Sequence, residues 1–268
     1  MKAIDIHTHV FPPDIARRAI PELEKTSKTR ALLDGTTDGL LDSMQRAGIS
    51  KSALMPIATK SNQVASINAW TASQDRRFFI PFGTLHPRME NLREAIAQVA
   101  HLGLYGVKLH PNYQEFAPDD PLMHPLYEAL VKHNLILLIH AGADMSFDNV
   151  IATPQSLAAV LRRFPLLKII AAHFGGWKQW DEVDTHLIST SIYLDTSYTL
   201  NYLPEERFVD MSRRHGIEKV LFGTDSPWAS QDREIEKIRK LPFAEWEKEC
   251  ILYRNACSLL GLSSDAET

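Results

Sequence analysis

A regular alternation of short apolar runs with segments of helical periodicity constrains the fold of this 268-residue chain more than any other feature. Strands that alternate with helices are typical of a parallel sheet built from βαβ units. The predicted strands are residues 2–9, 52–57, 78–85, 106–110, 135–140, 167–173, 192–196 and 220–225. The predicted helices are residues 37–47, 63–74, 91–101, 121–133, 154–164, 177–189, 204–215 and 231–241.

Eight such units in succession favour a closed (β/α)8 barrel, the TIM barrel, over a doubly wound sheet. No glycine-rich G-x-G-x-x-G motif follows the first strand, as a nucleotide-binding doubly wound sheet would require. No low-complexity linker, change of composition or sequence repeat divides the chain. We therefore expect residues 1–268 to form one domain of the α/β class, with residues 243–262 as a C-terminal helical cap.

Composition and charge argue against several classes of protein. The chain has 29 Lys+Arg against 33 Asp+Glu, and its basic residues are dispersed, so no nucleic-acid partner is expected. Its apolar runs are far shorter than the about 20 residues that cross a bilayer. Residues 1–10 carry charged and histidine side chains where a signal peptide needs an apolar stretch, so the cytoplasm is the expected location. Cys250 and Cys257 are expected to remain free thiols.

Polar side chains follow several of the predicted strands at their carboxyl ends, where (β/α)8 barrels carry their active sites. The first strand ends in His7-Thr8-His9, and the two-residue period of a strand directs both imidazoles to one side. His140, His173 and Asp225 end the fifth, sixth and eighth strands. Imidazole and carboxylate groups are ligands for zinc, and also for iron, manganese or nickel. The pattern therefore predicts a site for a divalent metal ion.

The sequence motifs around these residues are distinctive in their order along the chain. They are Asp5-Ile6-His7-Thr8-His9, Gly106-Val107-Lys108-Leu109-His110-Pro111, His140, Ala172-His173-Phe174-Gly175-Gly176 and Phe222-Gly223-Thr224-Asp225-Ser226-Pro227. Over nearly the whole chain, they resemble the amidohydrolase superfamily, in particular its amidohydrolase-related branch of metal-dependent hydrolases with a TIM-barrel fold. The resemblance implies that His7, His9, His140 and Asp225 ligate one ion, with Zn²⁺ expected. It implies that His173 ligates a second ion or acts as an acid/base group.

Lys108 has three alternative roles. In binuclear relatives a lysine of the fourth strand is carboxylated and bridges two metal ions. Alternatively, its ammonium binds a substrate carboxylate or phosphate, or forms a structural ion pair. His110 shares the same strand face and is expected to line the pocket. Arg88 and Trp177, in the segments after the third and sixth strands, are further candidates for contact with a small-molecule substrate.

Substrate specificity is expected in the loops that follow the strands. These are residues 11–35, a candidate lid, residues 112–120, residues 141–153 and the segment that begins at Trp177. Aromatic side chains in or near these loops could form walls suited to a planar or small organic acid. They are Tyr113, Phe116, Phe147, Trp177 and Trp228.

The resemblance implies as the main expectation a hydrolase that cleaves an amide, lactone or ester of a small organic acid with metal-activated water. Asp225 would take and pass on the proton of that water, while His173 would donate to the developing oxyanion. Relatives in the same branch include decarboxylases of aromatic or muconate-type acids, which is the first alternative. The second is a binding barrel without catalysis, although the intact set of ligands argues against it. Apolar helix faces could support a homodimer.

Overall fold

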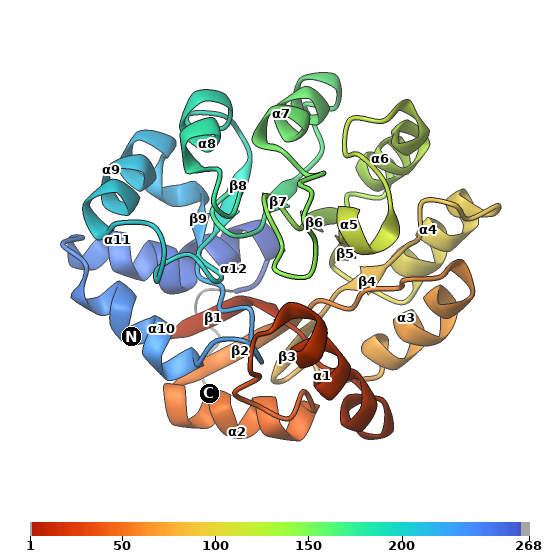
Figure 1. Cartoon of the computed structure of the whole chain (residues 1–268), viewed down its shortest axis with the longest axis horizontal. Coiled ribbons are helices and arrows are strands. Elements are labelled where there is room, and N and C mark those ends of the chain that lie inside the picture. The colour runs from red at the N-terminus through yellow and green to blue at the C-terminus, as the bar shows by residue number, and fades with distance from the viewer. Residues whose placement is uncertain (1, 264–268) are drawn as a thin grey trace.

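The strands of the chain surround a common axis and its helices form an outer ring (Figure 1). This computed structural model describes residues 2–263, and residues 1 and 264–268 lie outside the described part of the predicted domain. The strands are β1 Ala3–Thr8, β2 Ile49–Leu54, β3 Phe79–Pro81, β4 Gly83–Thr84, β5 Gly106–Leu109, β6 Ile136–Ile139, β7 Ile169–Ala171, β8 Tyr193–Asp195 and β9 Val220–Leu221. Each pair of hydrogen-bonded neighbours is parallel.

Eight strand positions close into a barrel, as predicted. β3 and β4 together occupy the single strand expected at residues 78–85, and Phe82 between them donates its amide to the carbonyl of Leu54 at 3.2 Å. The hydrogen-bonded order is β1-β2-β3 and β4-β5-β6-β7-β8-β9. Beyond β9, Thr8 forms a parallel bridge with Ser226, so the last strand position returns to the first. The (β/α)8 fold is therefore confirmed.

The ring of helices matches the predicted periodicity closely. It consists of α2 Thr37–Ala47, α3 Val64–Ala72, α4 Leu92–His101, α6 His124–Lys132, α7 Pro154–Arg163, α8 Trp180–His186, α9 Glu205–His215 and α10 Gln231–Lys240. The side chains of Thr36 and Thr153 cap α2 and α7 by accepting hydrogen bonds from the first helical turn. α8 begins at Trp180, three residues after the predicted start at Trp177. Short helical turns are η1 Ser61–Gln63, α5 Pro111–Gln114, η2 Pro121–Met123 and η3 Ile217–Lys219.

One expectation about the first long loop is wrong. Residues 11–35 contain a 15-residue helix, α1 Pro13–Ser27, rather than irregular structure alone. Pro21 lies inside this helix, although proline removes a backbone hydrogen bond. Pro21 is exposed, so water can satisfy the carbonyl that it leaves free. The helix buries only Ala16 and Ile20.

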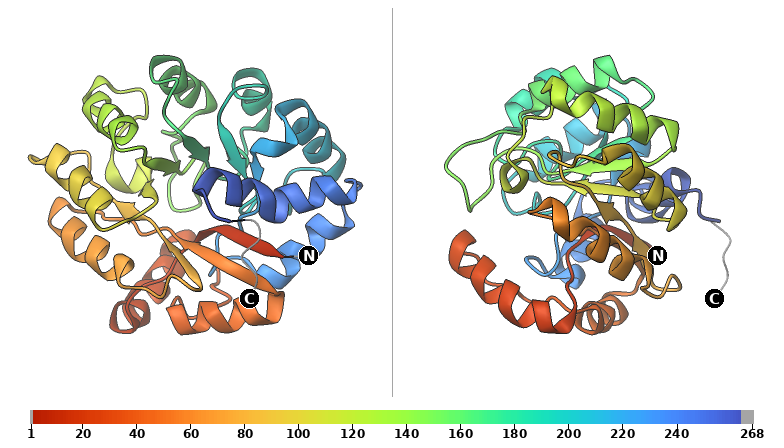
Figure 2. Two further views of the ribbon diagram at one scale, coloured as in Figure 1. Left: turned by 180° about the vertical axis from the view of Figure 1, so that it is seen from behind. Right: turned by 90° about the vertical axis from the view of Figure 1, so that its right-hand side faces the viewer.

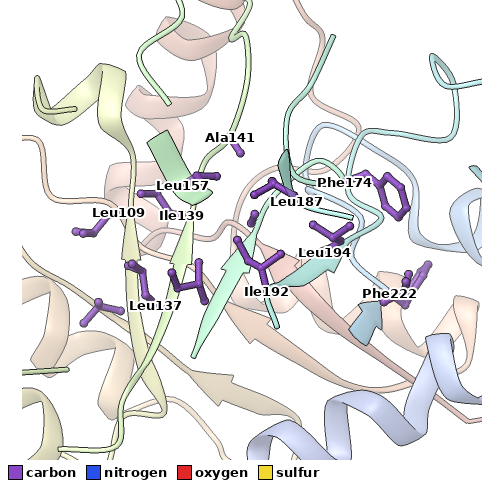
Figure 3. Packing of buried hydrophobic residues seen from close by; sticks show 14 of the residues in the cluster. Leu109, Leu137, Ile139, Ala141, Leu157, Phe174, Leu187, Ile192, Leu194 and Phe222 are labelled. Carbon is purple, nitrogen blue, oxygen red and sulfur yellow. The ribbon is translucent and has the colours of Figure 1, made fainter. Parts of the chain in front are cut away.

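Two apolar layers lie on opposite faces of the strands. Along β6, Ile136 and Leu138 belong to the cluster inside the barrel, whereas Leu137 and Ile139 belong to the cluster between strands and helices. Figure 3 shows part of the outer cluster around Leu137 and Ile139. A strand buried on both faces has a continuous apolar sequence, as this one does.

The C-terminal segment lies across one end of the barrel (Figure 2, left). It consists of α11 Glu245–Glu249, a π-helical turn η4 Cys250–Arg254 and α12 Asn255–Leu260, in agreement with the predicted cap. Asn255 donates its side-chain amide to the carbonyls of Ile217 and Val220 at 2.6 and 2.8 Å. Cys257 packs with the residues inside the barrel, and both cysteines are free thiols. Among residues 2–263, the structure contains no helix of the length and hydropathy that a membrane span requires.

Candidate metal centre

A β-bulge in β1 directs the first histidine toward the barrel axis. Asp5 pairs with Ser52 and Thr8 pairs with Leu54, so three steps along β1 correspond to two along β2. Asp5 faces outward, where its carboxylate accepts a hydrogen bond from Gln231 of α10 at 2.8 Å. Strict alternation from Asp5 would direct His7 outward too, and the extra residue reverses this. The bulge therefore directs His7 toward the barrel axis, the side on which His9 also lies.

Three of the predicted ligands converge at the carboxyl ends of the barrel strands. The Nε2 atoms of His7 and His9 are 3.2 Å apart, and Asp225 Oδ1 lies 3.4 Å and 3.1 Å from them respectively. Two ligands that lie about 2.1 Å from one ion are about 3.0 to 3.4 Å apart at angles from perpendicular to tetrahedral. The separation of these three atoms therefore fits a common metal ion.

The hydrogen bonds of both imidazoles fix their tautomers. His7 donates from Nδ1 to Asp195 Oδ2 at 2.9 Å, and His9 donates from Nδ1 to the backbone carbonyl of Met55 at 2.7 Å. A neutral imidazole carries one N–H, so the lone pairs of both Nε2 atoms face each other and the Asp225 carboxylate. A cation among these three atoms would replace their mutual repulsion by attraction.

The charge states of these groups suit metal binding. Burial lowers the pKa of His7 well below its usual range, and the nearby charge of Lys108 acts in the same direction. Burial by itself raises the pKa of Asp225, but the close contact with His9 and the neighbouring imidazoles outweigh it and hold the pKa at about 2. At neutral pH the site therefore offers neutral imidazole and ionised carboxylate, which are the forms that bind metal ions.

His140 and His173 lie beside this cluster. His140 donates from Nδ1 toward His173 Nε2 at 3.0 Å, which leaves a lone pair on His140 Nε2 with no hydrogen-bond partner among the described residues. A buried, unpartnered nitrogen is what a fourth ligand would offer. However, the group of donor atoms that all lie within 4.8 Å of one another contains His7, His9 and Asp225 but not His140. The ligand roles of His140 and His173 stay predictions.

A second group of potential ligands involves a residue that we did not predict. His110, His140 and Asp144 also have donor atoms within 4.8 Å of one another. The rings of His110 and His140 stack with centroids 4.1 Å apart, and His110 Nε2 lies 3.2 Å from Asp144 Oδ2. His110 thus lies beside the centre, as expected, while Asp144 lies in a loop where no sequence signal distinguished it.

Lys108 reaches the centre from β5. Its side chain is buried, and its Nζ lies 3.1 Å from His7 Nε2. Burial lowers its pKa from 10.5 to about 8, although the negative charges of Asp225, Asp195 and Asp144 act in the opposite direction. The amine is therefore still protonated at neutral pH. Lys108 is the one ammonium or guanidinium group among the described residues that line the cavity above the site.

The cavity has one polar and one apolar side. Besides the residues of the centre, it is lined by Phe11, Leu23, Ser27, Thr29, Ile57, Tyr113, Ala143, Asp144, Met145, Ser146, Trp177, Tyr198 and Trp228. Of the predicted aromatic walls, Tyr113, Trp177 and Trp228 are present, whereas Phe116 and Phe147 are absent from this lining. Arg88 is exposed and forms an ion pair with Glu115 at 3.1 Å, so the structure does not bring it to the cavity. Its contact with substrate stays a prediction.

Gly142 makes the position of Trp177 possible. The two residues form a parallel bridge, and a Cβ atom on Gly142 would lie 2.1 Å from the backbone nitrogen of Trp177. Gly142 also has a φ of 87°, in the region that favours glycine. The close approach joins the loop after β6 to the segment after β7, and both contribute to the cavity wall.

Two site residues have unusual backbone conformations. His173 and Asp225 have φ angles of 57° and 66°, in the left-handed region that residues other than glycine rarely adopt. Such conformations cost on the order of 1–3 kcal/mol and are concentrated at functional sites. Seven other residues of the described chain besides glycines share this conformation, so what distinguishes His173 and Asp225 is their place at the ends of two barrel strands.

Asp195 and Ser197 lie beneath the cluster and were missed in the sequence. Both are fully buried, and Ser197 donates its hydroxyl to Asp195 Oδ1 at 2.5 Å. Ser197 Oγ also lies 3.0 Å from the Nδ1 atoms of both His7 and His173. Asp195 is the last residue but one of the strand predicted at residues 192–196, and this position is the signal that could have identified it, but its sequence neighbours Leu194 and Thr196 gave no motif.

A comparison with protein families identifies the chain. The sequence profile described as amidohydrolase matches residues 4–262. The chain belongs to the amidohydrolase family. Among curated proteins, the decarboxylase orsB of Emericella nidulans is 26% identical over 132 residues, which are 41% of this chain and 39% of that relative's length.

Solved structures of similar fold cover almost the whole amidohydrolase chain. The 5-carboxyvanillate decarboxylase of Sphingomonas paucimobilis has a TM-score of 0.74 and 18% identity, covering 98% of this chain and 99% of its own. A dihydroxybenzoic acid decarboxylase of Polaromonas, solved with bound manganese, has a TM-score of 0.73 and 17% identity, covering 97% of each chain. A 2-pyrone-4,6-dicarboxylic acid hydrolase assigned in Pseudomonas putida has a TM-score of 0.68 and 18% identity, also covering 97% of each. These likenesses establish the TIM-barrel fold.

Proposed function

We propose that this amidohydrolase-family chain is a divalent-metal-dependent decarboxylase of a hydroxylated aromatic carboxylic acid. The observation that carries the proposal is the cavity itself. It combines three convergent metal ligands, one buried ammonium and the imidazole of His173 at its floor with aromatic side chains in its wall. A flat, anionic, ring-containing molecule matches this distribution of charge and apolar surface.

The relatives support decarboxylation over the hydrolysis that we expected first. The curated relative is a decarboxylase, and decarboxylases of two benzoic-acid-type substrates share the fold at nearly full coverage. One neighbour assigned as a hydrolase of a pyrone dicarboxylic acid keeps hydrolysis as the second candidate. The substrates named for the three solved structures are ring compounds that carry carboxylates, so the choice of a ring-containing acid does not depend on which reaction occurs.

Four side chains would hold the metal ion. They are His7, His9 and Asp225, with the unpartnered Nε2 of His140 as the candidate fourth ligand. When bound, a divalent cation supplies a Lewis acid that stabilises negative charge on substrate oxygen atoms. Manganese in the Polaromonas structure makes Mn²⁺ our first choice over the Zn²⁺ that we expected from the sequence, because carboxylate and imidazole suit both ions.

The chain's own residues would position the acid. The buried Lys108 offers an ammonium to a substrate carboxylate or phenolate oxygen, and a hydrogen bond between two charged groups is stronger than one between neutral groups. Trp177 and Trp228 contribute apolar ring surface in the cavity wall, against which an aromatic ring can pack. The helix α1 contributes Leu23 and Ser27 to the same wall, so the segment expected to be a lid does reach the cavity.

The proposed reaction exchanges a carboxylate for a proton at a ring carbon. The bond from the ring to the carboxylate carbon breaks, its electron pair stays on the ring carbon, and CO₂ leaves. His173 is our candidate for the group that delivers the proton to that carbon, while Asp225 is ionised as a ligand. Nε2 of His173 would first take up a proton from solvent, and delivery of that proton would return the ring to its neutral Nδ1–H form. His173 contacts Ser197 on one side and His140 on the other, which orients its ring toward the centre.

The test compares the two reactions on one preparation. Protein loaded with Mn²⁺ or Zn²⁺ is incubated with 2,6-dihydroxybenzoate, 5-carboxyvanillate and salicylate, and separately with 2-pyrone-4,6-dicarboxylate. We expect CO₂ release in stoichiometry with the decarboxylated ring, and its loss in His173→Asn at unchanged metal content. Lactone opening without any CO₂ release would overturn the proposal in favour of hydrolysis, and binding of the acids without turnover would favour the non-catalytic barrel.

A further inference from the structure

The hydroxyl of Ser197 connects two histidines that have different roles in the proposed centre. Its Oγ atom lies 3.0 Å from His7 Nδ1 and 3.0 Å from His173 Nδ1. His7 belongs to the group of metal ligands, whereas His173 is the candidate proton carrier. The three residues come from segments that are 24 and 190 residues apart in sequence, and all three are buried.

The hydrogen-bonding capacity of a serine determines what this contact does. The hydroxyl has one proton and two lone pairs, and its proton goes to Asp195 Oδ1 at 2.5 Å. Toward both imidazoles Ser197 Oγ can therefore only accept. Each imidazole must then carry its proton on Nδ1, which leaves the Nε2 lone pair of both rings directed away from Ser197.

Neighbouring acceptors strengthen this assignment. His7 Nδ1 also donates to Asp195 Oδ2 at 2.9 Å, and His173 Nδ1 lies 3.1 Å from the backbone carbonyl of Ser197. Asp195 Oδ1 additionally accepts the backbone amides of His173 and Ser197 at 2.9 and 3.0 Å. Asp195 Oδ2 and the Ser197 carbonyl can only accept, so a ring with its proton on Nε2 would direct an Nδ1 lone pair at them. For His7, that tautomer would also take from Asp195 Oδ2 its hydrogen-bond donor among the described residues.

We propose that Ser197 is a positioning residue that holds His7 and His173 in the same Nδ1–H tautomer through one shared hydroxyl. By this contact it adjusts the metal affinity of the centre and the availability of the His173 Nε2 lone pair together. The inference rests on the proposed metal centre but is independent of the reaction catalysed there. Groups of this kind around a metal ligand typically change metal affinity about 10- to 100-fold when they are lost.

The test uses two measurements that need no substrate. Mn²⁺ affinity is measured by titration followed by electron paramagnetic resonance, and histidine tautomers are measured in the metal-free, ¹⁵N-labelled protein by long-range ¹H–¹⁵N correlation. For Ser197→Ala we expect the dissociation constant for Mn²⁺ to rise about 10-fold or more. We also expect the Nδ1–H tautomer of His173 to lose population measurably, because the backbone carbonyl of residue 197 is then the remaining acceptor for that proton. Ser197→Thr, which keeps a hydroxyl, should restore both properties.

A matched control is available in the same chain. Ser212 is also fully buried, but its hydroxyl has no hydrogen-bond partner among the described residues, so Ser212→Ala removes the same atom without breaking a contact. This variant should bind Mn²⁺ as the wild type does. If Ser197→Ala does not fold, Ser197→Cys replaces it, because a thiol is a weak donor and acceptor of similar size.

The outcomes separate the inference from the proposed function. Wild-type Mn²⁺ affinity and unchanged Nδ1–H tautomers in the folded Ser197 variant would overturn the role of Ser197. A wild-type protein that binds no divalent ion would instead overturn the metal centre, and the tautomer measurement would still decide the role of Ser197. If the wild type does not decarboxylate the ring acids, the proposed function fails, but the measurements of Mn²⁺ affinity and of histidine tautomers still test the role of Ser197.

Discussion

Replacement of Lys108 by methionine tests the charge state of the side chain with the most ambiguous role. Lys108 is 1% exposed, and its Nζ lies 3.1 Å from His7 Nε2. Burial lowers its pKa from 10.5 to about 8. This difference corresponds to about 3 kcal/mol, because one pH unit is worth about 1.4 kcal/mol. At pH 7 the buried charge of Lys108 therefore lowers the free energy of unfolding by about this amount. A methionine of similar length carries no charge and removes this penalty.

The sign of the pH dependence follows from proton linkage. Between about pH 8 and pH 10.5, the unfolded chain keeps a proton on Lys108 that the folded chain has released. Raising the pH through this window therefore stabilises the wild type but not Lys108→Met. At pH 7 we expect the free energy of unfolding of Lys108→Met to exceed that of the wild type by about 3 kcal/mol. This difference should disappear by pH 10.5. Denaturant unfolding of chelator-treated protein across this range measures the difference.

The control variant is Lys240→Met, at an exposed position of α10. Its difference in stability from the wild type should stay constant between pH 7 and pH 10.5. Parallel stability curves for the wild type and Lys108→Met would refute the assignment of a buried ammonium. Native mass spectrometry would then distinguish a carboxylated lysine, which adds the mass of one CO₂, from an unmodified amine.

Four further changes probe the centre and the scaffold. Protein with His7→Ala and His9→Ala should retain no Mn²⁺ by elemental analysis, since two of three convergent donors are lost; full loading would contradict their ligand role. Asn255→Leu should lower the free energy of unfolding by about 2–4 kcal/mol, because two buried carbonyls lose their donor. Gly142→Ala should lower it by about 1–3 kcal/mol or more through the clash with Trp177. Burial lowers the pKa of His215 from 6.5 to about 4, so wild-type stability relative to His215→Gln should fall by about 3 kcal/mol as pH drops through this window. Urea unfolding measures the last three, and pH-independent differences would refute the histidine prediction.

Much of the site could be predicted because barrel strands repeat one local pattern. His140, His173 and Asp225 each follow an apolar run, and in a parallel barrel the ends of such runs meet. The same logic failed for residues whose importance depends on a distant partner. Asp195 contacts His7 across 188 residues, and nothing in the residues around it indicates that contact.

The periodicity of apolar residues depends only on neighbours along the chain. It was enough to predict the eight strand–helix units and to place the histidines of the site at the ends of strands. Tertiary structure alone decided that a bulge directs His7 inward, that Pro21 can lie within a helix, and that Arg88 faces solvent beside Glu115. It also decided which imidazoles share an acceptor, because a hydrogen bond between remote strands depends on the register and closure of the barrel. Short-range propensity sets the elements, whereas the chemistry of the centre depends on side-chain distances that exist only once the barrel has closed.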